Sequence, residues 1–466
     1  MSTPSPSHAL KTGMKIVTPR DELYPDAHEY RIDSVIGQGG FGITYKATNL
    51  SGFRFAISET EYIWIEAGTP LAIKECFRAD CMKRLSNGMV RLTGDDDSVR
   101  KGSNIRKKFI DEARAIYQCQ KGLPSGQRSN LRSGLVPVYH VGSCSGESSD
   151  FYPTPNEYTG DMICFYVMPY IEGSTLKDEM LDLDPEEIVG LLYYCLKAVE
   201  RLHNLRLKDG NRALHLDIKP ENIIRTREGY PVLIDYGGLV SRGIHTKAYA
   251  APEQTNSHSD DPSEPDFGDP SEATDVYGLG TTFYRLIVAS ELDKKAMVPP
   301  AAERVQAYKY KWPDPYTRLE GNDQCREFFG PPLSAANGEN WWSEHFLHGI
   351  DKALRLDPQK RWKSVREWRK SVFSKTLYPW HGEVERKRPM PRAPRPSRQK
   401  KNSSSTPEIT IPHPVPHERA QEQQPDNTRR LLIAIVAVLA VLIAGLLYLG
   451  ITHNGVLHYN SEIQSN

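Results

Sequence analysis

The chain has 466 residues, and its 59 basic and 59 acidic side chains give a formal net charge of zero at pH 7. This balance excludes the class of proteins that bind nucleic acid through a generally basic surface. The 7 cysteines are odd in number and widely scattered, which argues against a zinc site and indicates a reduced compartment. A chain of this length is expected to hold one large folded unit with appendages.

The first 15 residues are rich in Ser, Thr and Pro without an apolar stretch that could serve as a signal peptide, and we expect residues 1–25 to be disordered. Residues 26–375 have the pattern of one folded unit. Its first part predicts one charged helix, 105–118, and strands over 30–36, 43–48, 54–57, 71–75 and 164–170. After Gly173 helical patterns dominate, for example over 185–204. The sequence therefore predicts an α+β fold with a strand-rich small lobe and a helical large lobe.

A glycine-rich segment, Gly37-Gln38-Gly39-Gly40-Phe41-Gly42, lies between two of the strand patterns. A dinucleotide-binding turn would instead lie between a strand and a helix. Glycines let a backbone bend tightly and approach phosphate oxygens, so this segment is typical of a lid over the phosphates of a nucleotide. A glycine-rich hairpin without a function is the alternative.

A lysine ends the strand pattern Leu71-Ala72-Ile73-Lys74 and is flanked by apolar residues, which indicates a fixed cation. The charged helix carries Glu112, which could face Lys74 and hold it against the α and β phosphates of a nucleotide. Taken alone, either residue could equally be an ordinary surface charge.

The most specific motif is the loop His215-Leu216-Asp217-Ile218-Lys219-Pro220-Glu221-Asn222, with Asp235-Tyr236-Gly237 beginning 13 residues after Asn222. It resembles the catalytic loop and metal-binding motif of the eukaryotic-type (Hanks-type) serine/threonine protein kinase family, in which they read His-Arg-Asp-x-x-x-x-Asn and Asp-Phe-Gly. Together with the glycine segment, Lys74 and Glu112, the resemblance extends over residues 30–372. The residues of these motifs are similar to those of bacterial members of the family.

The resemblance implies a bilobal protein kinase fold, ATP as the phosphate donor and Mg²⁺ as the metal, with Mn²⁺ as an alternative. Asp217 would accept the proton of the substrate hydroxyl, and Lys219 would steady the transferred phosphate. Asn222 and Asp235 would hold the metal, because oxygen ligands suit a hard dication. Lys74 and Glu112 complete the expected catalytic set.

The resemblance also implies a nucleotide pocket, although core packing explains its apolar members equally well. Ala72 would border the adenine, Ile224 would form part of its floor, and the stretch from Met168 to Ile171 would join the lobes. The full set expected to contact the nucleotide is Ile36, Gly37, Gln38, Gly39, Gly40, Phe41, Gly42, Ile43, Thr44, Ala72, Lys74, Met168, Tyr170 and Ile224.

The activation segment is expected to end at Thr246 to Glu253. By resemblance, Lys219 and Thr246 indicate Ser and Thr as acceptors, Glu253 would pair with Arg361, and Asp275 would brace the catalytic loop. Leu216 departs from the family pattern, because it replaces the arginine that normally receives an activation-loop phosphate. We therefore expect activity without such a phosphate.

The C-terminal part predicts a membrane anchor. Residues 431–450 are an unbroken 20-residue apolar run, long enough as a helix to cross a bilayer, although a buried core helix is an alternative. Arg429 and Arg430 precede the run, which predicts a cytoplasmic kinase domain at the inner membrane and an external tail over 451–466. Residues 376–430 are expected to be a disordered linker, whose basic part, 386–401, either attracts anionic lipid or is a solvated spacer.

The sequence thus predicts a membrane-anchored kinase that acts on protein Ser and Thr hydroxyls, its own among them, and binds no nucleic acid. A pseudokinase that serves as a tethered scaffold is the first alternative, and a small-molecule kinase is the second. Two insertions, 76–104 and 256–272, have no assigned chemistry.

Overall fold

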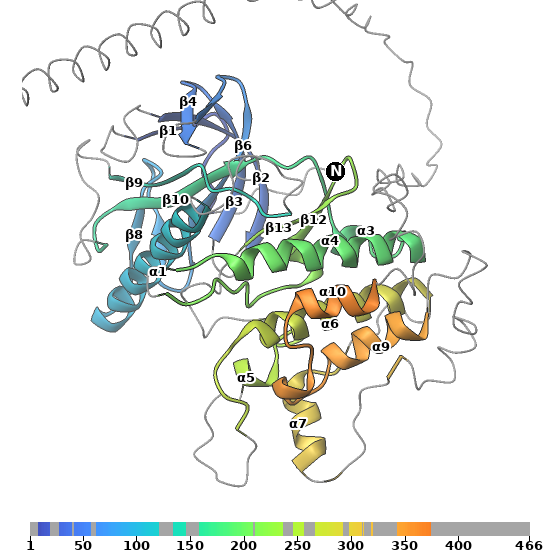
Figure 1. Cartoon of the computed structure of the whole chain (residues 1–466). Helices are drawn as coiled ribbons and strands as arrows, with labels where there is room; N and C mark the ends of the chain where they lie inside the picture. The colour runs from blue at the N-terminus through green and yellow to red at the C-terminus, as the bar shows by residue number, and fades with distance from the viewer. Residues whose placement is uncertain are drawn as a thin grey trace, which may run out of the picture. The chain divides into compact units, whose positions relative to one another are not determined.

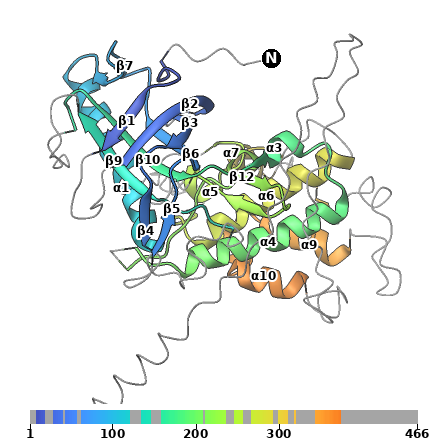
Figure 2. The ribbon, with the colours of Figure 1, turned by 90° about the horizontal axis from the view of Figure 1, so that it is seen from above.

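The computed structural model describes residues 8–18, 28–39, 42–56, 62–120, 134–145, 158–207, 210–235, 246–255, 266–291, 298–309, 311, 318–319 and 343–373. In both ribbon views the strands of the N-terminal part and the helices of the C-terminal part form separate regions (Figures 1 and 2). This is the predicted division into a strand-rich and a helical lobe.

The small lobe is built on a six-stranded sheet with the order β1-β2-β3-β6-β10-β9, in which every neighbouring pair is antiparallel. Its strands are β1 (Lys15–Thr18), β2 (His28–Gly39), β3 (Gly42–Asn49), β6 (Pro70–Cys76), β9 (His140–Ser145) and β10 (Met162–Pro169). Four of the five predicted strands are therefore confirmed as β2, β3, β6 and β10, and the fifth, 54–57, is found as β4 (Phe53–Ala56) outside this sheet.

The N-terminal segment corrects one prediction. Residues 8–18 are not disordered as expected, since β1 pairs with β2 and the side chains of Leu10 and Ile16 are buried. The amide of Gly13 donates to the carbonyl of Ile32, and the amide of Ile32 donates to the carbonyl of Met14. These bonds extend the pairing with β2 to the residues before β1. Polar and apolar residues alternate in Lys15–Thr18, and this short pattern is enough for an edge strand, because only one of its sides pairs with a neighbour.

Helix α1 (Asp96–Gln120) covers one face of the sheet (Figure 1). It begins at Asp96 rather than at the predicted residue 105, because the end of the 76–104 insertion is part of the helix. Arg106 is buried in this helix and donates to the carbonyls of Val90, Tyr158 and Gly160 at 2.6–2.9 Å. A buried guanidinium with three carbonyl partners fixes the helix to β8 (Val90–Leu92) and to the segment that leads into β10.

Two hairpins complete the small lobe. One consists of β4 (Phe53–Ala56) and β5 (Tyr62–Ile65), and it places Phe53 and Phe55 in the core. The other consists of β7 (Met82–Arg84) and β8 (Val90–Leu92), and it is made by the 76–104 insertion. The insertion that had no predicted role is thus an ordered part of this lobe.

The large lobe is mainly helical. Helix α4 (Pro185–Asn204) has the predicted bounds and begins with a capping box, in which Asp184 and Glu187 exchange side chain to backbone hydrogen bonds. The other helices are α3 (Leu176–Glu179), α5 (Pro252–Thr255), α6 (Glu272–Glu291), α7 (Ala301–Lys309), α9 (Glu344–Ala353) and α10 (Val365–Val372), with 3₁₀ turns η2 (Pro220–Asn222) and η3 (Pro358–Lys360). A three-stranded sheet, β11 (Gly173–Thr175), β12 (Ile223–Thr226) and β13 (Pro231–Leu233), carries the loop described below.

None of the helices that the structure describes is both long and apolar enough to cross a membrane. The predicted span, 431–450, and the predicted linker and tail on either side of it lie outside the described residues.

Candidate active site

The glycine-rich segment forms a hairpin between β2 and β3. Its register pairs Gly37 with Thr44, Gln38 with Ile43, and Gly39 with Gly42, while Gly40 and Phe41 lie outside the described residues. At Gly42 an added Cβ would lie 1.8 Å from the carbonyl oxygen of Glu75 on β6. A glycine is required here, because the two backbones approach too closely for a side chain.

The sheet register sorts the expected nucleotide residues by face, since directly opposed residues point to the same side. Lys74 opposes Thr44 on β3, and Ala72 opposes Met168 on β10. Thr44, Ala72, Lys74 and Met168 therefore share a face. Ile43 opposes Glu75 instead, so its side chain is buried on the other face, contrary to the expectation that it contacts the nucleotide.

Lys74 forms an ion pair with Asp235, which joins the small lobe to the start of the predicted metal motif. Burial alone would lower the pKa of Lys74, but the charge of Asp235 outweighs it and raises that pKa. Burial would likewise raise the pKa of Asp235, and the Lys74 ammonium lowers it. Both groups are charged at neutral pH as a result.

Glu112, the expected partner of Lys74, contributes to the site as a nearby negative charge on α1. That charge adds to the charge of Asp235 in raising the pKa of Lys74. Tyr166 opposes Lys74 directly on β10 and is buried, which raises its own pKa. Sequence reasoning missed Tyr166, because one aromatic residue in a buried strand carries no signal of its own.

The catalytic-loop motif surrounds the carboxylate of Asp217 with donors. Lys219 Nζ lies 2.6 Å from Asp217 Oδ2, and Asn222 Nδ2 lies 3.0 Å from the same oxygen. The other oxygen, Oδ1, accepts from the hydroxyl and the backbone amide of Thr246, at 3.0 and 3.2 Å. Four residues to which the resemblance assigned roles are thus brought together in one hydrogen-bonded group.

A buried carboxylate holds the start of this loop. Asp275, on α6, accepts the backbone amides of His215 and Leu216 at 2.8 Å each, and His203 lies 2.8 Å from its Oδ2. Leu216 has a φ of +60°, a left-handed conformation that costs free energy for a branched residue and needs this support. The prediction that Asp275 braces the loop is confirmed.

Asn222 and Asp235 are adjacent through the backbone, since the amide of Ile234 donates to the carbonyl of Asn222 at 3.0 Å. The Asn222 amide nitrogen faces Asp217, so its side-chain oxygen is the atom suited to a metal. Together with the ionised Asp235 carboxylate it makes an oxygen donor set, which fits Mg²⁺ or Mn²⁺. The residues present therefore fit the metal that the motif predicts.

The segment that joins the lobes contains Met168 and Tyr170. Met168 is buried, and the Tyr170 ring receives Lys46 Nζ at 4.4 Å from its centroid. Ile224 on β12 is partly buried, and Ile36 on β2 is 46% exposed, unusually for a large apolar residue. An exposed isoleucine at the glycine hairpin is consistent with the predicted contact to a nucleotide.

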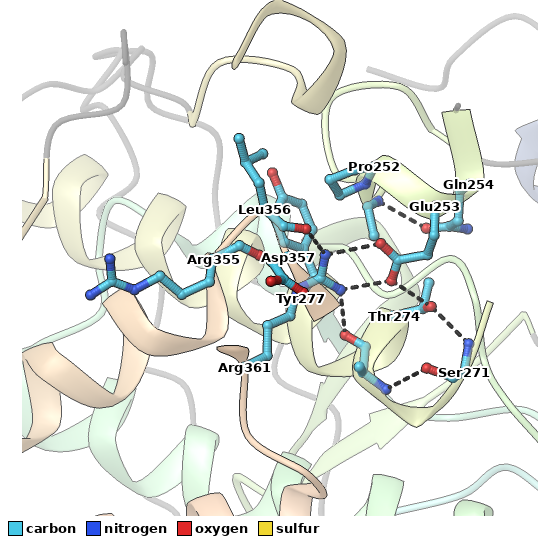
Figure 3. Close-up of polar contacts among 12 residues, drawn as sticks. Pro252, Glu253, Gln254, Ser271, Thr274, Tyr277, Arg355, Leu356, Asp357 and Arg361 are labelled. Carbon is cyan, nitrogen blue, oxygen red and sulfur yellow. Dashed lines mark hydrogen bonds and ion pairs between the residues drawn. The ribbon is translucent and has the colours of Figure 1, made fainter. Parts of the chain in front are cut away.

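The end of the activation segment is fixed by an internal ion pair. Arg361 binds Glu253 through both guanidinium nitrogens, at 2.7 and 2.9 Å, and neither side chain has exposed surface (Figure 3). Thr274 donates to the same carboxylate, and carbonyls of Ala273, Arg355 and Leu356 receive the remaining guanidinium hydrogens. The predicted pairing of Glu253 with Arg361 is confirmed.

A second tether was missed in the sequence. Gln254 Nε2 donates to the carbonyl of Leu216 at 2.8 Å, and Gln254 Oε1 accepts the amide of Ala251 at 3.0 Å. The glutamine therefore links the activation segment to the catalytic loop at the residue that replaces the expected arginine. The Leu216 partner is a backbone carbonyl, so no residue type in the sequence signalled this link.

Comparisons with known proteins agree with this geometry. Residues 156–373 match the family model described as the protein kinase domain. The serine/threonine-protein kinase PknA of Nostoc sp. is 26% identical over 271 residues, 56% of this chain and 41% of that protein. The serine/threonine-protein kinase PknD of Chlamydia muridarum is 23% identical over 394 residues, 72% of this chain and 34% of that protein. The chain thus spans less than half the length of these two relatives.

Among solved structures, one described as the apo form of PpkA-294 superposes with a TM-score of 0.50 at 21% identity, covering 78% of this chain and 100% of that one. At this identity the likeness concerns the fold. A two-lobed fold with this loop defines a protein kinase domain. Residues 156–373 are thus a protein kinase domain, and the resemblance to the bacterial eukaryotic-type serine/threonine kinases is confirmed.

Proposed function

We propose that this protein transfers the γ-phosphate of ATP to serine and threonine hydroxyls of proteins, its own included. The observation that carries the proposal is the environment of Asp217, whose two oxygens accept hydrogen bonds from Lys219, Asn222 and Thr246. A carboxylate oriented in this way is suited to accept the proton of an attacking hydroxyl. The names of the curated relatives support Ser and Thr as the acceptors.

Each residue of the site has a separate task in this proposal. The substrate oxygen attacks the γ-phosphorus as the bond to the bridging oxygen of ADP breaks, and the hydroxyl proton passes to Asp217. Lys219 offers its positive charge to the transferred group, and Lys74 offers its charge to the α and β phosphates. Asn222 and Asp235 would hold Mg²⁺, which when bound neutralises charge on the phosphates.

Phosphate transfer from labelled ATP tests the proposal. The full chain is incubated with Mg²⁺ and a generic basic protein, beside an Asp217→Asn variant and an Asp182→Asn variant, whose exposed carboxylate lies outside the site. Label on Ser or Thr that is lost only in Asp217→Asn supports a kinase. Nucleotide binding without transfer in the unaltered chain would support the pseudokinase scaffold, and transfer to a sugar or aminoglycoside alone would support a small-molecule kinase.

We further propose that residues 431–450 anchor the protein in the inner membrane, with the kinase domain, 26–375, in the cytoplasm. The unbroken apolar run and the preceding Arg429 and Arg430 support this orientation. Residues 376–430 would act as a tether and 451–466 as an external tail. Extraction with carbonate tests the anchor: we expect the chain in the membrane pellet, and recovery in the supernatant would contradict it.

A further inference from the structure

A buried acidic residue immediately follows Lys74 on β6. Glu75 points to the opposite face of the sheet, and its side chain has no exposed surface. Arg84 on β7 binds it through Nη1 and Nη2 at 2.6 Å each, and the Tyr45 hydroxyl donates to it at 2.7 Å. We call Tyr45, Glu75 and Arg84 the outer-face cluster.

The N-terminal segment, residues 8–14, is bonded to the same cluster. The amide of Leu10 donates to the Tyr45 hydroxyl oxygen at 3.1 Å, and Arg84 Nε donates to the carbonyl of His8 at 2.9 Å. The rings of His8 and Phe77 stack with centroids 5.4 Å apart, and the Arg84 guanidinium lies 5.1 Å from the Phe77 centroid. The N-terminal segment, the β7–β8 hairpin and β6 therefore meet at one carboxylate.

The location of the cluster relates it to the site. Glu75 and Lys74 are consecutive residues of a central strand, so their side chains leave opposite faces from Cα atoms about 3.8 Å apart. Any movement of β6 that carries Glu75 away from Arg84 also displaces the base of Lys74. The ammonium of Lys74, on the nucleotide face, is where the proposed phosphate contact is made.

Stability alone is a weak reason for this arrangement. A buried ion pair commonly stabilises a fold no more than apolar residues of the same volume would, because both charges lose their hydration. It is nevertheless geometrically strict, since a bidentate guanidinium and carboxylate accept few relative positions. The ion pair of Glu75 with Arg84 is therefore suited to fix the position of the neighbouring residue, Lys74.

We propose that Glu75 and Arg84 are positioning residues for Lys74. The pair, locked in place by residues 8–14 and Tyr45, holds β6 where the Lys74 ammonium meets the α and β phosphates of ATP. This inference rests on the proposed kinase function. It also gives the 76–104 insertion a role, because that insertion supplies Arg84.

The test compares full-length variants for thermal midpoint, KM for ATP, kcat and the Kd of a fluorescent ATP analogue. Arg84→Met removes the charge, Arg84→Lys conserves it, and Tyr45→Phe removes only one donor. Phe55→Leu, in the β4 hairpin, is the control for a loss of core packing. We expect Arg84→Met to raise KM and Kd at least tenfold with kcat within threefold, Arg84→Lys to restore most of this, and Tyr45→Phe to raise both about threefold.

The opposite result is a fall in thermal midpoint for Arg84→Met and Tyr45→Phe with KM and Kd unchanged, as expected for Phe55→Leu. It would show that the cluster only stabilises the lobe. If Arg84→Met does not fold, Tyr45→Phe decides, because it removes one oxygen without introducing a cavity of side-chain size. If the unaltered chain transfers no phosphate, the kinase proposal fails, and the Kd values still decide whether the cluster positions Lys74.

Discussion

The hydroxyl of Thr246 connects Lys219 to Asp217: its oxygen lies 2.6 Å from Lys219 Nζ and 3.0 Å from Asp217 Oδ1. Lys219 also binds Asp217 directly, at 2.6 Å from Oδ2. The three groups close a triangle between the catalytic loop and the end of the activation segment. The orientation of the proposed proton acceptor therefore depends on a residue 29 positions away in the chain.

Removing this hydroxyl should slow the chemical step. In Thr246→Val the shape is kept, but the charged groups of Lys219 and Asp217 each lose their hydrogen bond with the Thr246 hydroxyl. A hydrogen bond that involves a charged group contributes about 1.5–3 kcal/mol. We expect kcat to fall at least tenfold while KM for ATP stays within twofold, since Lys219 keeps its charge and the residues that share a sheet face with Lys74 are unchanged. Thr246→Ser is the control, and equal losses of kcat in the two variants would contradict the account.

Activation should not require a phosphate on the activation segment. Leu216 carries no charge to receive one, and Gln254 already joins the segment to the loop at the Leu216 carbonyl. Ser241 is the sole Ser or Thr between Leu239 and His245, a stretch outside the described residues. Ser241→Ala should retain at least half of the activity in a steady-state transfer assay, whereas Gln254→Leu should reduce it several-fold. Loss of activity in Ser241→Ala would show that a phosphate is needed.

Removing one partner of the Glu253–Arg361 pair should strongly destabilise the large lobe. Both side chains lack exposed surface, so Arg361→Met leaves a buried carboxylate without its counter-ion, at a cost of about 3–5 kcal/mol. The double variant Glu253→Gln with Arg361→Met should recover part of this loss, because no charge then remains buried. Urea unfolding measures the free energy of unfolding of the two variants, and a double variant less stable than Arg361→Met would contradict the argument.

A buried histidine should make the small lobe sensitive to acid. His140 is 1% exposed beside His28 and Tyr30, and burial lowers its pKa well below 6.5. It is neutral in the fold but takes up a proton when unfolded, so its contribution is complete above pH 6.5 and is lost as the pH falls below it. The loss approaches about 1.4 kcal/mol per pH unit for one proton. Urea unfolding gives the free energy of unfolding at each pH between 7.5 and 5.5. This free energy should fall less steeply with decreasing pH in His140→Gln than in the unaltered chain, and an equal fall in both would contradict the assignment to His140.

Much of the fold could be predicted because its patterns are local. The strands β2, β3, β6 and β10 and helix α4 appear where alternation or helical spacing placed them, with ends shifted by at most three residues. The error at residues 8–18 has a non-local cause. That short segment is ordered by pairing with β2 and by burial of Leu10 and Ile16, which no property of its own composition signals.

The polar residues of the candidate site could be predicted from the sequence, whereas the residues that hold them in position were harder to predict. Asp217, Lys219 and Asn222 lie within six positions, so the spacing itself brings them together. Ile43 was misplaced because the faces of a strand can be told apart only from its register, which pairs it with Glu75. Gln254 was missed since its partner Leu216 is distant in sequence, and Arg84 was missed since it lies in an insertion without a recognised pattern.

The account depends above all on Asp217 as the proton acceptor, and the direct measurement is a single-turnover transfer of labelled phosphate by the full chain and by Asp217→Asn. We predict the same Kd for ATP in both proteins and a rate of transfer at least a thousandfold lower in the variant. A variant that transfers phosphate at a rate near that of the unaltered chain would show that Asp217 is not the proton acceptor.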